Sequence, residues 1–109
     1  MPTRILKTHD VIKIKEAELV DRLKSMSLEE LEFHTLNIMK DMGAKSYPEM
    51  MTLIMTTIKE DHQEGYSQFE TVQKTLQDTL PNKAFMSDIY ARLAAMVMTI
   101  ISRKYADLL

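Results

Sequence analysis

Three helix starts of one kind divide the chain into segments. The pattern Ser-x-x-Glu begins at Ser27, at Ser46 and at Ser67. In this capping box the serine oxygen accepts a hydrogen bond from the N–H three residues on, and the glutamate reaches back to the serine N–H. Gly43 and Gly65 stand just before the second and third starts, where the preceding helices are expected to end. These signals predict a series of helices joined by short loops.

The spacing of apolar residues extends this prediction over nearly the whole chain. Apolar side chains recur every three or four residues, which gives each segment an apolar face, and we find no convincing strand pattern. The predicted helices are Lys15–Ser25, Leu28–Met42, Tyr47–Glu64, Gln68–Leu80 and Lys83–Tyr105. The first has Leu19, Val20, Leu23 and Met26 on one side, and the fourth has a narrow stripe of Phe69, Val72, Leu76 and Leu80.

The fifth predicted helix is apolar around most of its circumference, so we expect other helices to surround it. Short loops favour antiparallel neighbours. We therefore predict an all-α fold, a small bundle of four to five antiparallel helices. The bundle is a single domain of residues 15–109, and residues 1–14 form a short N-terminal basic arm.

Composition excludes several classes of function. The 109 residues include no cysteine, which excludes disulfides, a zinc ribbon and a thiol nucleophile, and the two glycines cannot build a phosphate-binding loop. The longest nearly continuous apolar stretch, Leu93–Ile101, falls short of the roughly 20 residues that span a bilayer. Met1–Asp10 lacks the apolar core of a secretory signal. We expect a cytoplasmic protein that does not enter a membrane.

The histidines offer no metal-binding pattern. A carboxylate-bridged di-iron bundle needs Glu-x-x-His on two helices, but Leu31 and Lys59 stand three residues before His34 and His62. We expect His34 to be half-exposed on its helix and His62 to be solvated. A nucleophile motif such as Gly-x-Ser-x-Gly is also missing from the sequence. The prediction is therefore a protein without metal, cofactor or catalytic activity.

The net charge of −2 is unevenly distributed, and the first 15 residues carry +3. The basic residues of this arm are Arg4, Lys7, Lys13 and Lys15. Such an arm contacts an acidic partner or nucleic acid, so a nucleic-acid-binding regulator is the alternative function.

The second and third predicted helices also have the order of a helix-turn-helix. The recognition helix would then begin Tyr47-Pro48-Glu49-Met50-Met51, and it carries there none of the Arg, Lys, Asn or Gln residues that pair with purine edges. Nucleic acid is therefore the disfavoured partner.

A stretch of about thirty residues, Ser27–Ile58, resembles a known family. It contains Leu28-Glu29-Glu30-Leu31-Glu32, then Gly43-Ala44-Lys45-Ser46, then Glu49-Met50 and Leu53. These residues resemble the helical tail domain of tRNA-dependent amidotransferase B subunits, and the resemblance implies a contact with tRNA. The chain departs from that pattern directly afterwards, because Lys59–Glu64 is acidic where the family has a loop with glycine and lysine.

Ten methionines in 109 residues are the most unusual feature of the composition. Methionine fills irregular cores, and it also forms adaptable contact surfaces. The apolar arc of the third predicted helix covers more than half its circumference, which is more than we expect one small bundle to bury. We therefore predict a non-catalytic interaction module, a small regulator, inhibitor or adaptor that binds a protein partner or forms a homo-oligomer. The predicted contact residues are Met50, Met51, Met55 and Ile58. A small ligand in the bundle core is the second alternative.

Overall fold

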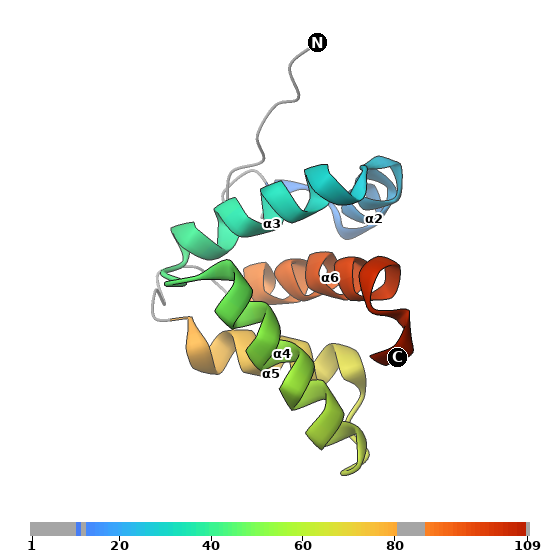
Figure 1. Cartoon of the computed structure of the whole chain (residues 1–109). Helices are drawn as coiled ribbons and strands as arrows, with labels where there is room; N and C mark the ends of the chain where they lie inside the picture. Colours follow the sequence, from blue (N-terminus) through green and yellow to red (C-terminus); the bar gives the residue numbers. More distant parts are fainter. Residues whose placement is uncertain (1–10, 12, 81–86, 109) are drawn as a thin grey trace.

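The computed structural model describes residue 11, residues 13–80 and residues 87–108, and these residues form an all-helical bundle (Figure 1). The elements are α2 (Glu16–Ser25), α3 (Leu28–Asp41), α4 (Tyr47–His62), α5 (Gln68–Thr79), α6 (Ser87–Lys104) and the 3₁₀ turn η1 (Ala106–Leu108). The predicted all-α fold class is confirmed. Most predicted boundaries differ from the observed ones by one or two residues. The predicted start of the last helix, at Lys83, lies outside the described residues.

The three predicted caps form the starts of α3, α4 and α5. The Ser27 and Ser67 hydroxyls each accept a hydrogen bond from the backbone N–H three residues on, at 3.1 Å, and Ser46 does so at 3.4 Å. Gly43 and Gly65 have φ of 95° and 88°, in the left-handed region that glycine adopts without steric cost. Helix starts and stops thus follow from local sequence.

Helix α6 forms the centre of the core. It packs against α2, α3 and α5, while α4 packs mainly on α5. Figure 1 shows α3 and α5 running opposite to α6, and α4 crossing obliquely. The buried side chains of α6 are Ile89, Tyr90, Leu93, Ala94, Met96, Val97, Ile100 and Ile101. The expectation that the last helix is surrounded by the others is therefore confirmed.

Two arginines of α6 fasten α2 at both of its ends. Arg92 donates to the Ile14 carbonyl, just before α2, with Nε and Nη2 both at 3.3 Å. Arg103 donates to the Leu23 and Met26 carbonyls at the other end, both at 2.8 Å. The last carbonyls of a helix lack partners within it, and they carry partial negative charge that a cation stabilises. The short α2 is thereby held along α6.

We expect Ser27→Ala to lower the free energy of unfolding by about 1 kcal/mol, because the Glu30 N–H then loses its acceptor. Urea denaturation measures the change. Ser25→Ala is the matched control: its hydroxyl donates to the Arg22 carbonyl at an exposed helix end, so its effect stays within about 0.5 kcal/mol. Equal losses for the two variants would contradict the assigned cap.

Arg103→Met removes the hydrogen bonds to the end of α2 and is expected to cost about 1–2 kcal/mol in urea denaturation. Arg103→Lys restores only part of this loss, because an ammonium lacks the planar fork that reaches several carbonyls. Lys74→Met, on the exposed part of α5, serves as the control and changes stability by less than about 0.5 kcal/mol. Full rescue by lysine would show that charge alone holds α2.

Candidate functional site

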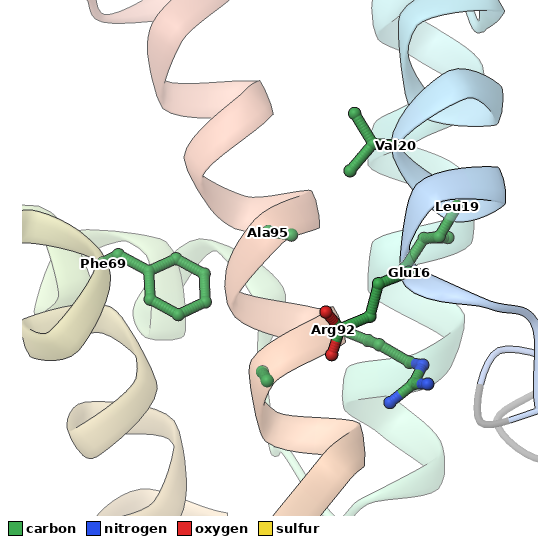
Figure 2. Close-up of a pocket in the computed structure, with 7 residues that line it drawn as sticks. Glu16, Leu19, Val20, Phe69, Arg92 and Ala95 are labelled. Atoms are coloured by element: carbon green, nitrogen blue, oxygen red, sulfur yellow. The ribbon is translucent and has the colours of Figure 1, made fainter.

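An apolar groove of about 310 Å³ runs along α6 between α2 and α5 (Figure 2). Ala95 lies at its floor, which Ala91 also lines, and Glu16 and Arg92 stand together at one end. Its walls are Leu19 and Val20 on α2 and Phe69 on α5. We call this feature the α6 groove.

The α6 groove exists because small residues on α6 meet larger ones on its neighbours. The alanines at positions 91 and 95 are one helical turn apart, so they share a face of α6. Their short side chains leave space above this face. Val20 and Phe69 are 42% and 40% exposed, although both belong to the apolar faces that the sequence predicts. Large apolar side chains left in water around a concave apolar floor are typical of an interaction site.

The predicted contact residues on α4 are mostly buried in the bundle. Met50, Met51 and Ile58 are only 8%, 5% and 1% exposed, and Met55 is half-buried. These side chains are buried because α4 has three neighbours, α5, α3 and η1, which together cover a wide apolar arc. The exposed apolar residue on α4 is Leu53, at 42%. Of the four predicted contact residues, Met55 presents the most surface, and their contact with a partner stays a prediction.

The residues predicted to contact nucleic acid are only partly described. Lys13 and Lys15 are exposed, and the other two basic residues of the arm, Arg4 and Lys7, lie outside the described residues. The start of α4 lies against its own bundle: the Tyr47 hydroxyl donates to Glu32 at 3.4 Å, and Met50 points into the core. The predicted phosphate contact of the N-terminal arm stays a prediction.

His34 is buried, with 1% of its surface exposed, whereas the sequence analysis expected a half-exposed side chain. It follows Leu31 by three residues and precedes Ile38 by four, so it lies on the same buried face of α3 as these apolar residues. Its ring lies edge-on to Phe33, with centroids 6.0 Å apart. Burial lowers the pKa of His34, and the nearby Glu30 carboxylate opposes that change in part. His62 is exposed, as expected.

A polar cluster joins α3, α4 and the end of α6. The Glu32 carboxylate accepts hydrogen bonds from the Tyr47 hydroxyl and from Lys104 Nζ, each at 3.4 Å. Burial, with Glu32 as the second cause, raises the pKa of Tyr47, which therefore stays protonated and acts as a donor. Glu32 also raises the pKa of Lys104. No sequence motif identified this cluster, because its members are far apart along the chain.

The part of the chain that the structure describes contains neither a cluster of metal ligands nor a membrane-spanning helix. There, no three or more His, Asp or Glu side chains lie close enough to hold a metal ion. None of the helices described is both long enough and apolar enough to cross a bilayer.

Comparison with protein-family models, with curated proteins and with solved structures gives no match. The contact with tRNA that the resemblance of Ser27–Ile58 implies therefore stays a prediction.

The burial of His34 predicts a pH dependence of stability. Since its folded pKa lies below 6.5, the unfolded chain takes up this proton first as the pH falls below about 6.5. The free energy of unfolding should therefore decrease between about pH 7.5 and about pH 5, and the decrease should be smaller in His34→Gln. Urea denaturation across this range measures the slope. His62→Gln, at an exposed position, should keep the wild-type slope. An unchanged slope in His34→Gln would refute the assignment.

Proposed function

We propose that this chain is a non-catalytic helical interaction module, a small cytoplasmic regulator, inhibitor or adaptor, which self-associates through the α6 groove. The observation that supports the proposal is the pair of exposed side chains, Val20 and Phe69, on the two walls of an alanine floor. The lack of cysteine is compatible with a reducing compartment.

A second copy of the chain is the occupant that this surface fits. Two-fold dimers are the commonest oligomers, and their contact patch must be complementary to itself. The α6 groove has both parts of such a patch, since Val20 and Phe69 project beside the space above Ala91 and Ala95.

The charges on α2 support the same occupant. Glu16, Val20 and Lys24 are exposed and four residues apart, so they share one face of the helix. If two copies of α2 meet antiparallel at Val20, each Glu16 lies opposite the partner's Lys24. Charge complementarity of this kind fixes the register and favours the correct pairing.

The alternative is a nucleic-acid-binding regulator that uses the basic arm, in which Lys13 and Lys15 are exposed. The two functions differ in their response to salt. Binding to a random DNA duplex that weakens steeply with salt would favour the alternative, because released counterions drive such binding.

Size-exclusion chromatography with light scattering tests the proposal. We expect the wild-type chain to have twice the 12.7 kDa mass of one copy, and Ala95→Arg to be a folded monomer, since the arginine fills the floor of the groove. Thr56→Arg is the matched control: it places the same side chain on the exposed face of α4 and should remain a dimer.

Two charge reversals test the register. Glu16→Lys and Lys24→Glu should each weaken the dimer, and the double variant should recover most of the loss, as a double-mutant cycle measures. A wild-type chain that is monomeric at every concentration would overturn self-association.

A further inference from the structure

A second pocket, of about 380 Å³, lies between α3, α4 and the C-terminal end of α6. It shares no lining residue with the α6 groove, so its role is independent of the proposed function. One part of it is apolar and includes Met51, Met55 and Ile100. Its volume falls in the range of pockets that hold small organic molecules, about 300–1,000 Å³.

The polar part of this pocket surrounds a single positive charge. Lys104 Nζ lies 3.4 Å from a carboxylate oxygen of Glu32 and 5.6 Å from the centroid of the Tyr105 ring. The same carboxylate oxygen accepts the Tyr47 hydroxyl, which holds it toward the pocket. A carboxylate together with an aromatic face is the combination that proteins use to bind ammonium groups.

The chain's own lysine therefore occupies a cation site at the mouth of an apolar pocket. Lys104 is the last residue of α6, and 42% of its side chain is exposed, so it has room to swing into solvent. Water screens an exposed ion pair of this kind, so its replacement by another cation costs little. A ligand that brings both a positive charge and an apolar chain gains the buried contacts that lysine does not make.

We propose that this pocket binds a primary alkylammonium ion, whose charged group replaces Lys104 between Glu32 and Tyr105 and whose alkyl chain lies along Met55 and Pro48. Methionine side chains adapt readily to the shape of such a chain. Lys104 acts as an internal competitor and sets the affinity of the site. Glu32 supplies the charge that selects a cation over a neutral or anionic molecule of the same length.

Titration with n-hexylammonium chloride, followed by NMR chemical shifts, tests the site. Lys104→Met removes the competitor and should bind the probe at least about tenfold more tightly than the wild type. Adding Glu32→Gln to Lys104→Met should reverse this gain, and 1-hexanol, which has the same chain without the charge, should bind at least about tenfold more weakly. Lys74→Met, which removes an exposed lysine from α5, should bind as the wild type does.

Circular dichroism establishes that each variant is folded, and Lys104→Gln replaces Lys104→Met if the latter is not. Two results would overturn the proposal. One is equal affinity of the wild type and both Lys104 variants for the probe. The other is binding of 1-hexanol as tight as that of n-hexylammonium, since the pocket would then recognise the alkyl chain alone.

Discussion

The burial of α6 is the constraint on which the rest of this structure depends. Its wide apolar arc cannot remain in water, because burying apolar area is the dominant favourable term in folding. Helices α3 and α5 cover it from two directions and run antiparallel to it, and α2 packs on it as well. The fold is therefore best described as one central helix with neighbours added until most of its surface is covered. Helix α4 packs mainly on α5 and also contacts α3 and η1.

The polar side chains of α6 determine how the last neighbour is attached. Arg92 donates to the Ile14 carbonyl before α2. Arg103 donates to carbonyls at the end of α2, which the helix itself leaves without partners. Between these two attachments, Ala91 and Ala95 of α6 have side chains too short to fill the space between α2 and α5. The α6 groove thus has two causes. The ends of α2 are held by the two arginines, and the space between α2 and α5 stays open above the alanines.

The two candidate sites differ in the chemistry that they offer. The α6 groove presents apolar side chains around an alanine floor, which suits another protein surface, whereas the pocket at the end of α6 combines a carboxylate, a tyrosine ring and methionines. Many other polar groups are used within the fold. Threonine hydroxyls on α3, α4, α5 and α6 donate to the carbonyl four residues earlier, Thr35 and Thr99 among them. These hydroxyls are therefore used within the helices that carry them.

Local interactions made the fold predictable from the sequence, and non-local ones decided the sites. The starts of α3, α4 and α5 and the glycine stops involve residues a few positions apart, so Ser27 or Gly43 carries its signal wherever the helices finally lie. The exposure of a side chain depends instead on how many neighbours its helix acquires. Helical spacing alone therefore left open the burial of Met50 and His34 and the exposure of Phe69. The bonds from Arg103 to the end of α2 join residues 77 and 80 positions apart, and only the tertiary structure brings such groups together.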